Sequence, residues 1–329
     1  MRNRRLKDRG ELALLKEIQK RFRGRAKDVV AGIGDDCAVI VPRKDKLLLT
    51  TDMMVQGVHF DLAFTTYFQL GFKTISVNVS DIFAMGGSPR FALLDIAAPE
   101  DTQENSLNAF FKGVEKALRG YCITLVGGDL SASDTLVVSA TLIGYAQQPV
   151  LRSGARPGDK IYITGNLGDS ACGLELLKRI KRPVSLETGE RIHTPLGWST
   201  MRPLLKRHLL TEARNPGRIA DIATAMIDVS DGLFIDLYRL CEESRMGARI
   251  YITQLPLSAQ MIKAASYLGK EPDVLATSGG EDYELLFTAP PRRRVDASCI
   301  GEITDSERVI VDRDGSERPF SPEGYQHWR

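Results

Sequence analysis

A polar segment near the middle of the chain, Arg-Ser-Gly-Ala-Arg-Pro-Gly-Asp at residues 152–159, constrains the fold most strongly. It contains a Pro-Gly turn and follows a long section with strand character, so it is the best candidate for a domain boundary. On either side of it, apolar segments of strand length alternate with segments of helical period. A chain of 329 residues has room for two domains. We therefore expect an α/β or α+β protein with an N-terminal domain over residues 1–148 and a C-terminal domain over residues 149–329.

The spacing of the apolar residues predicts the individual elements. Steps of three and four predict helices over residues 10–22, 67–85, 105–118, 168–180 and 232–243. Short apolar runs between turn residues predict strands at residues 39–41, 47–49, 91–97, 121–126, 135–145, 160–164, 225–229, 249–253 and 283–288. Residues 191–215 are rich in Pro, Arg and His and predict an irregular connection with a short helix.

The charge balance and the cysteine pattern limit the class of protein. With 44 Lys and Arg against 42 Asp and Glu, the formal net charge is only +2, which argues against a nucleic-acid partner. The 5 cysteines are far apart and form no Cys-x-x-Cys pair, so they predict free or buried thiols in a reducing compartment. No apolar run approaches the roughly 18 residues of a membrane span. We therefore expect a cytoplasmic protein that binds neither nucleic acid nor membrane.

A set of aspartates carries the strongest indication of chemistry, because each stands at the end of an apolar strand or on the polar side of a helix. The set comprises Asp35, Asp36, Asp52, Asp81, Asp129, Asp228 and Asp231. Each one alone is more simply a turn residue or a helix cap. Together they favour a ligand site at strand ends, where converging carboxylates would repel one another without cations between them. Magnesium, which bridges carboxylates to substrate phosphates, fits this pattern.

Three local patterns support a phosphate site. Thr74, Asn78 and Asp81 are spaced by four and three residues, which predicts one helical stripe that points out of the core. Gly127-Gly128 before Asp129 allows backbone amides to approach an anion. Ser230-Asp231-Gly232 opens a predicted helix, whose first amides form a natural phosphate seat. The familiar P-loop, Rossmann, protein-kinase, serine-hydrolase and zincin signatures are all missing from the sequence.

The ordered motifs resemble the thiamine-monophosphate kinase family, which belongs to the superfamily of aminoimidazole-ribonucleotide synthetase. The motifs are GIGDDCAVI, TTDMMVQGVHF, NVSDIFAMGG, LVGGDL, RSGARPGD, DVSDGL and SGGEDYEL, and the resemblance extends from about Gly10 to Gly324-Tyr325-Gln326-His327. It implies an N-terminal sheet domain that forms a homodimer and a C-terminal α/β domain. It also implies magnesium-dependent transfer of the ATP γ-phosphate to thiamine phosphate, with several Mg²⁺ ions and ATP as co-substrate.

The resemblance further implies roles for individual residues. The magnesium ligands would be Asp36, Thr50, Thr51, Asp52, Asp81, Asp129, Asp228 and Asp231, with Asp81 and Asp231 also assigned to catalysis. Gly128, Asp129, Arg152 and Ser230 would bind ATP, and His59, Glu281 and Tyr325 would bind thiamine phosphate. The sequence departs slightly from the family, with Thr50 where serine is common and Val229 where isoleucine is common. No role is carried over to residues 194–215, and His193, His208 and His327 are expected on the surface or in packing.

The chemistry of the residues agrees with this activity. A phosphate acceptor has a second pKa near about 6, so it is already largely anionic and needs no strong general base. The difficulty is to bring two polyanions together in line, and cations meet that need.

Three alternatives remain open at this point. The first is a related synthetase, although selenophosphate synthetase expects a reactive cysteine near the N-terminus and Cys37 lies inside the Asp-Asp motif. The second is a hydrogenase-maturation carrier, which acts through a C-terminal cysteine, whereas this sequence ends Gln326-His327-Trp328-Arg329. The third is a nucleotide-binding regulator without turnover.

Overall fold

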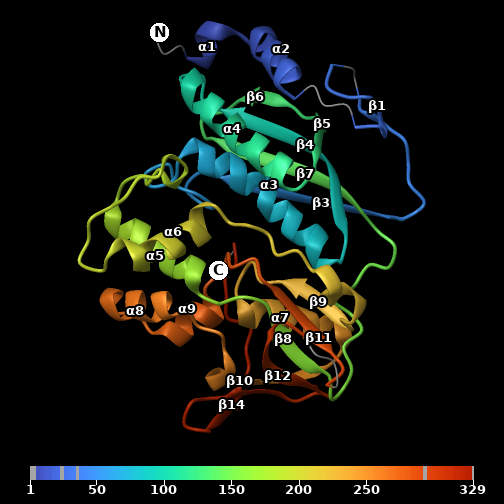
Figure 1. Ribbon diagram of the computed structural model, residues 1–329, viewed down its shortest axis with the longest axis vertical. Helices are drawn as coiled ribbons and strands as arrows, with labels where there is room; N and C mark the ends of the chain where they lie inside the picture. Colours follow the sequence, from blue (N-terminus) through green and yellow to red (C-terminus); the bar gives the residue numbers. More distant parts are fainter. Residues whose placement is uncertain (1–4, 23–25, 35–36, 292–294, 328–329) are drawn as a thin grey trace. The chain divides into compact units, whose positions relative to one another are not determined.

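The computed structural model describes residues 5–22, 26–34, 37–291 and 295–327, which form two compact units (Figure 1). Unit 1 takes its described residues from Met1–Ile82, Gly87–Gln147 and Lys181–Glu190, and unit 2 takes the rest. Both units mix helices and sheets, as the sequence predicts. The chain passes from unit 1 to unit 2 after Gln147, next to the predicted domain boundary at residues 148/149. We keep that boundary as a proposal, because two short segments are exchanged between the units.

The sheet of unit 1 has the strand order β3-β7-β4-β5, with β6 paired to β4. The strands are β3 (Lys46–Val55), β4 (Ser88–Ala98), β5 (Thr124–Gly127), β6 (Leu130–Ala132) and β7 (Val137–Ala146). The long β3 and β4 both pair antiparallel with β7, and β4 pairs parallel with β5 and β6. A separate ribbon, β1 (Val29–Ala31) with β2 (Val39–Ile40), packs against Phe91 and Tyr145 on part of this sheet.

Two long helices of unit 1 pack closely against each other. They are α3 (Tyr67–Ala84) and α4 (Glu104–Gly120), and Figure 1 shows them side by side near the strands. A Cβ atom on Gly71 would lie 2.1 Å from the Phe110 carbonyl oxygen, and one on Gly113 would lie 1.9 Å from that of Phe68. Only glycine permits this approach at either position. The short α1 (Leu6–Arg9) and α2 (Glu11–Arg21) precede the ribbon, and the exchanged segment contains a 3₁₀ turn, η1 (Leu186–Thr188).

Unit 2 contains a seven-stranded sheet in the order β14-β13-β10-β12-β8-β11-β9. Its strands are β8 (Lys160–Ile163), β9 (Ala225–Asp228), β10 (Gly247–Tyr251), β11 (Leu285–Ala289), β12 (Ser298–Thr304), β13 (Arg308–Val311) and β14 (Glu317–Pro319). All pairs are antiparallel except β10 with β13. Every residue of β9 and β11 is buried, and short, continuous apolar runs of this kind are typical of interior strands.

The helices of unit 2 include those that the sequence predicts and add several more. They are α5 (Asp169–Ile180), α6 (Trp198–Leu209), α7 (Leu233–Ser244), α8 (Ala259–Leu268) and α9 (Pro272–Ser278), with 3₁₀ turns η2 (Gly217–Asp221) and η3 (Ile252–Gln254). The irregular connection with a short helix expected over residues 191–215 is observed, and its helix is α6, which has 12 residues and tolerates Pro203 in its interior. Packing offsets the hydrogen bond that proline cannot donate, since Met201, Leu204 and Leu205 are all buried.

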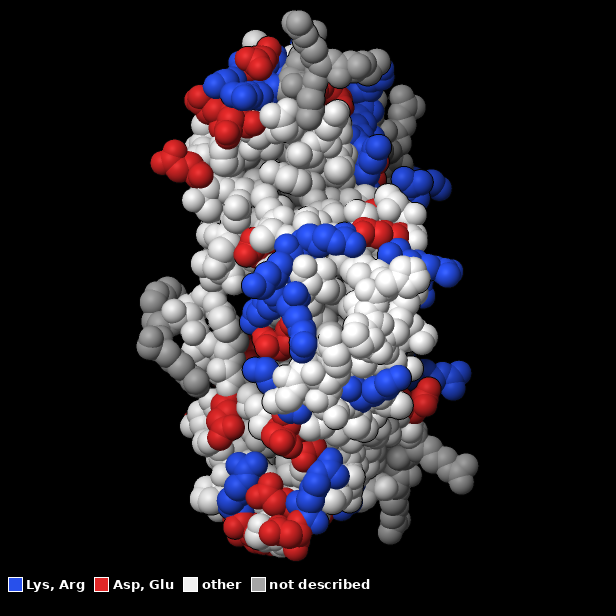
Figure 2. Space-filling model, turned by 90° about the vertical axis from the view of Figure 1, so that its left-hand side faces the viewer, with Lys and Arg blue, Asp and Glu red and all other residues white. Residues whose placement is uncertain are grey.

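The surface agrees with the near-neutral composition. On the face drawn in Figure 2, basic and acidic side chains lie interspersed. Surface ion pairs such as Arg313–Asp273, at 2.7 Å, are examples of this arrangement. Among the described residues, no helix has both the length and the apolar character needed to cross a membrane.

Candidate active site

The alternation of side chains along β3 separates two neighbouring threonines. Successive residues of a strand point to opposite faces of the sheet. The Thr50 hydroxyl donates to the Asp81 carboxylate on α3, so Thr50 and Asp52 belong to the face that meets α3. Thr51 points the other way, with its hydroxyl 3.1 Å from that of Thr141. The structure thus brings Thr50 and Asp81 together and directs the side chain of Thr51 away from them.

The predicted polar stripe on α3 is buried rather than outward-facing. Thr74 and Asn78 are 1% and 0% exposed, whereas Asp81 is half-buried. The expectation that the stripe points out of the core is therefore wrong at its first two positions, because the whole of residues 71–80 is enclosed. The Asn78 amide nitrogen donates to the Thr74 carbonyl oxygen at 3.0 Å. Its Oδ1 is the only buried side-chain nitrogen or oxygen without a hydrogen-bond partner in the described part of the chain.

The Gly128-Asp129 turn is held tightly against β4. Gly128 has φ of +149°, and a Cβ atom there would lie 1.8 Å from the Leu94 carbonyl oxygen, so the position requires glycine. The Asp129 amide donates to Leu94 at 3.2 Å, and the Ile96 amide donates to Asp129 at 3.0 Å. These bonds fix the Asp129 backbone while its side chain stays exposed.

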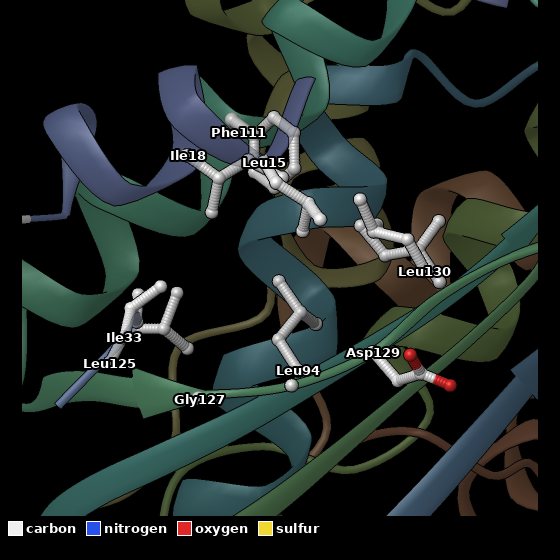
Figure 3. Close-up of a pocket in the computed structure, with 11 residues that line it drawn as sticks. Leu15, Ile18, Ile33, Leu94, Phe111, Leu125, Gly127, Asp129 and Leu130 are labelled. Carbon is white, nitrogen blue, oxygen red and sulfur yellow. The ribbon is translucent and has the colours of Figure 1, made fainter. Parts of the chain in front are cut away.

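An apolar pocket adjoins this turn (Figure 3). Asp129 lies at its edge with the carboxylate directed away from the apolar side chains. The lining residues are Leu15, Ile18, Ile33, Leu94, Ile96, Phe111, Leu125, Gly127, Gly128, Asp129 and Leu130. A mainly apolar lining with a few polar groups at one side is typical of small-molecule sites. The sequence pattern did not predict that α2 contributes to this pocket.

Two further residues of unit 1, His59 and Asp36, were predicted to belong to the site. His59 is half-buried in the turn after β3, where its Nδ1 accepts a hydrogen bond from the Val55 amide at 3.0 Å. Asp36 lies outside the described residues.

In unit 2, three predicted motifs meet through backbone hydrogen bonds. The Glu281 amide donates to the Ser230 carbonyl oxygen at 2.7 Å, and the Tyr283 amide donates to that of Val229 at 2.8 Å. The Tyr325 amide donates to the Asp231 carbonyl oxygen at 3.0 Å. The segment Asp228–Gly232, the loop before β11 and the C-terminal segment therefore form one local structure. Asp228 is buried at the end of β9, and Asp231 is half-buried.

The chain itself occupies the expected phosphate seat before α7. The amides of Ser230, Asp231 and Gly232 donate to Asp236 Oδ2 at 3.0, 3.0 and 3.2 Å. Arg239 Nη1 lies 2.7 Å from both Asp231 Oδ2 and Asp236 Oδ1. Burial raises the pKa of Asp236 to about 6, although Arg239 acts in the opposite direction. A carboxylate from the first turn of α7 thus caps these three amides in the structure, and phosphate binding at the start of this helix stays a prediction.

The two fully buried acids of the loop before β11 are each satisfied. Asp282 accepts the Gly168 and Ser170 amides, at 2.7 and 3.2 Å, at the start of α5. Burial raises the pKa of Asp282 to about 7. Glu284 accepts the Thr164 hydroxyl at 2.5 Å and Arg214 Nε at 2.7 Å, and it pairs with Arg207 as well. Burial acts to raise the pKa of Glu284, but Arg214 and Arg207 outweigh it, and the pKa is lowered.

The third acid of the loop, Glu281, is held by a histidine. His208 Nδ1 lies 3.0 Å from Glu281 Oε2 and 3.2 Å from the Ser170 hydroxyl. His208 was expected either on the surface or in packing, and it is buried. The sequence did not predict its contact with Glu281. Arg207 and Arg214, from the segment to which no role was assigned, were missed too. The signal for Arg207 in the sequence was positive charge beside the buried stripe of an amphipathic helix, whereas Arg214 lies beyond the end of that helix.

Two predicted residues of unit 2 are exposed. The Arg152 side chain is exposed, and its carbonyl oxygen accepts the Ser244 hydroxyl at 2.9 Å. Tyr325 is exposed as well, with its hydroxyl 3.3 Å from His327 Nδ1.

The predicted metal ligands are shared between the two units. Thr50, Thr51, Asp52, Asp81 and Asp129 belong to unit 1, and Asp228 and Asp231 belong to unit 2. Within the described ranges, no group of three or more His, Cys, Asp or Glu side chains is arranged to hold a metal ion.

Comparison with known proteins identifies the family. Models of the AIR synthase related protein match residues 34–146 (N-terminal domain) and 156–314 (C-terminal domain). A thiamine-monophosphate kinase of Aquifex aeolicus (strain VF5) is 37% identical over 329 residues, with 98% of this chain and 100% of that protein covered. The chain belongs to the thiamine-monophosphate kinase family. The Salmonella typhimurium (strain LT2) member is 37% identical over 338 residues and covers 97% of this chain and 98% of its own.

Solved structures agree with this membership. The structure of AaThiL complexed with AMPPCP and TMP has a TM-score of 0.77 and 36% identity, with 100% of both chains covered. A hydrogenase maturation protein, HypE in complex with ATP, has a TM-score of 0.67 at 20% identity, covering 97% of this chain and 96% of its own. That likeness shows a shared fold only. The family resemblance stated from the motifs is confirmed.

Proposed function

We propose that this chain transfers the γ-phosphate of ATP to thiamine phosphate and releases thiamine diphosphate and ADP. Its family carries the name of this activity, and the AaThiL structure holds AMPPCP, an analogue of ATP, together with TMP. The observation that supports it best is the junction of the Asp228–Gly232 segment with the Glu281 loop by backbone hydrogen bonds of 2.7 and 2.8 Å. This junction supports the proposal because it joins the segment of the proposed metal ligands Asp228 and Asp231 to the loop of Glu281, which is proposed for the organic part of the acceptor.

Each unit, taken by itself, offers oxygen donors that suit magnesium. Thr50, Asp52 and Asp81 in unit 1, and Asp228 and Asp231 in unit 2, offer only the hard oxygen atoms that Mg²⁺ prefers. Asn78 Oδ1, buried without a hydrogen-bond partner three residues before Asp81, is a further oxygen suited to a hydrated cation. When bound, Mg²⁺ would neutralise the phosphate oxygens and so permit two anionic groups to approach each other. We retain Asp36, Asp129 and Thr51 as proposed ligands from the family resemblance alone, although the Thr51 hydroxyl lies on the opposite face of β3 from that of Thr50.

The protein residues would bind and orient the two substrates. Gly128, Asp129, Arg152 and Ser230 are proposed for ATP, and the apolar pocket beside Gly128 offers a surface for the base. The phosphate of the acceptor is itself the nucleophile and is largely anionic near neutral pH, with a second pKa of about 6. A strong general base is therefore not required. His59, Glu281 and Tyr325 are proposed to hold the thiamine part, with the Glu281 carboxylate able to offset a cationic ring.

We propose a homodimer formed through the outer face of the unit 1 sheet. On β3, Leu47, Leu49 and Met53 point to the face opposite α3, and Leu49 is 65% exposed. A row of exposed apolar side chains on an edge strand is unfavourable in water and is typical of an interface. The same face on a second copy would cover it in a symmetric, self-complementary contact.

We place the enzyme in the cytoplasm. Its 5 cysteines are all unpaired in the structure. Cys172 and Cys241 are buried, and burial raises the pKa of each to about 12, so both are unreactive thiols. This usage suits a reducing compartment.

A panel of acceptors tests the function. Purified protein with ATP and Mg²⁺ is assayed against thiamine phosphate, thiamine and several other phosphomonoesters, and each product is identified by chromatography. We expect thiamine phosphate to react far faster than thiamine, which offers only a neutral hydroxyl and would need a base. Comparable phosphorylation of thiamine would refute the phosphate-to-phosphate transfer. ATP binding without any product would favour the regulator instead.

A further inference from the structure

A buried histidine from α6 holds the carboxylate of the loop before β11. His208 Nδ1 lies 3.0 Å from Glu281 Oε2, and the His208 and Glu281 side chains are 7% and 27% exposed. We propose that His208 is a positioning residue, which fixes the Glu281 carboxylate for recognition of the thiamine part of the acceptor. This inference rests on the proposed function, in which Glu281 binds thiamine phosphate.

The loop that carries Glu281 is strained, and Glu281 itself is only partly buried. Glu281 and Tyr283 have φ of +66° and +48°, a left-handed backbone that costs free energy in residues other than glycine. Its backbone is restrained by the Glu281 amide, which donates to Ser230 at 2.7 Å. The side chain, however, has three further rotatable bonds, and ordering them costs entropy. A contact with a buried, packed histidine removes that freedom before the substrate binds.

The geometry assigns the contact to one ring nitrogen. A carboxylate oxygen only accepts, so the inference requires that Nδ1 carries the proton and donates it to Glu281. The hydroxyl of Ser170, at the start of α5, lies 3.2 Å from the same nitrogen. The amide nitrogen of asparagine reaches the Nδ1 position of a histidine, whereas that of glutamine reaches the Nε2 position. Asparagine therefore restores the donor and glutamine does not.

Two substitutions of His208 separate positioning from packing. For His208→Gln we expect the KM for thiamine phosphate to rise about tenfold, with kcat and the KM for ATP within about twofold of wild type. For His208→Asn we expect a KM for thiamine phosphate within about threefold of wild type. His193→Gln, at an exposed histidine, is the matched control and changes neither KM. In a Glu281→Gln background, His208→Gln adds no further increase, because the pair acts as a unit.

Several results would overturn the inference. One is an equal effect of His208→Asn and His208→Gln, and another is a parallel rise in the KM for ATP. If the variants fail to fold, nitrogen NMR of the wild-type protein decides, because the inference requires a proton on Nδ1 of His208 and a ring protonated only on Nε2 contradicts it. A wild-type enzyme that does not phosphorylate thiamine phosphate would refute the proposed function instead, and the NMR result would still report on the pair.

Discussion

The two units present their acidic residues in different ways. In unit 1, Thr50 and Asp81 stand on a regular strand and a regular helix, whose backbones are held by sheet and helix hydrogen bonds. In unit 2, Asp231 and Glu281 stand on loops, which are held by side chains such as Asp236 and His208. On a strand or helix, the regular backbone alone decides where a functional side chain points. A functional side chain on a loop needs a buried side chain elsewhere in the fold to hold it.

The largest expected effect is loss of activity from unit 1. We expect Asp81→Asn to lower kcat/KM by about a thousandfold or more, roughly 4 kcal/mol in transition-state stabilisation, with an unchanged thermal midpoint. The substitution removes a negative oxygen beside Thr50 without changing the volume of the side chain. Asp134→Asn, at an exposed aspartate, removes the same charge and serves as the control in steady-state kinetics. Activity of Asp81→Asn within about threefold of wild type would refute the ligand assignment.

The next effect is a loss of stability in unit 2. Glu284→Gln leaves Arg207 and Arg214 without their buried carboxylate, so we expect unfolding by urea to become easier by about 3 kcal/mol. Glu302→Gln breaks the partly exposed pair with Lys160 and costs less than about 1 kcal/mol. Equal losses in the two variants would show that the buried loop partners are dispensable.

A third effect concerns the outer face of β3. We expect Leu49→Lys to give a monomer in light scattering at micromolar concentration, with a dimer dissociation constant raised at least about a hundredfold, or about 2.7 kcal/mol. A charge introduced at the centre of an apolar interface is left without a partner. Leu12→Lys, at an exposed leucine on α2, is the control. We expect its molecular mass in light scattering to equal that of the wild-type dimer. A wild-type protein that is already monomeric would contradict the proposed dimer.

The smallest effect is a pH dependence that arises in unit 2. Burial raises the pKa of Asp282 to about 7, above its value in the unfolded chain, so the folded state binds a proton that the unfolded state has lost. This group therefore lowers stability as the pH rises from 5 toward 7. We expect the stability of Asp282→Asn, measured relative to wild type by urea unfolding, to improve by about 1 kcal/mol between pH 5 and pH 6. Identical pH dependence in the two proteins would contradict the effect.

The sequence predicts the amphipathic helices of both units for physical reasons, including those over residues 168–180 and 232–243 in unit 2. The helices over residues 10–22, 67–85 and 105–118 are observed close to their predicted ends, because apolar periodicity decides burial. The same periodicity misjudged Asn78, since it cannot say how many faces of a helix are covered. It also could not show that Thr50 and Thr51 would point apart until the strand was known to extend through them.

In unit 2, the sequence predicts the motifs of the site but not the residues that hold them in place. The loops with Asp228, Asp231 and Glu281 stand out by composition, and the structure joins them. Arg207 and His208 are separated from Glu281 by more than seventy positions along the chain. Pairing at that distance depends on tertiary packing, which local spacing does not encode. Helix α8 had a readable signal, because Ser258 caps its start and Gly269 ends it in a left-handed conformation.

Phosphorus NMR of a single reaction tests the central claim most directly. Wild-type protein is mixed with ATP, Mg²⁺ and thiamine phosphate, and the signals of all phosphate groups are followed over time. The account predicts that thiamine diphosphate and ADP accumulate in equal amounts while inorganic phosphate stays at its initial level. Accumulation of ADP with inorganic phosphate, and no thiamine diphosphate, would contradict the transfer and leave only a nucleotide hydrolase.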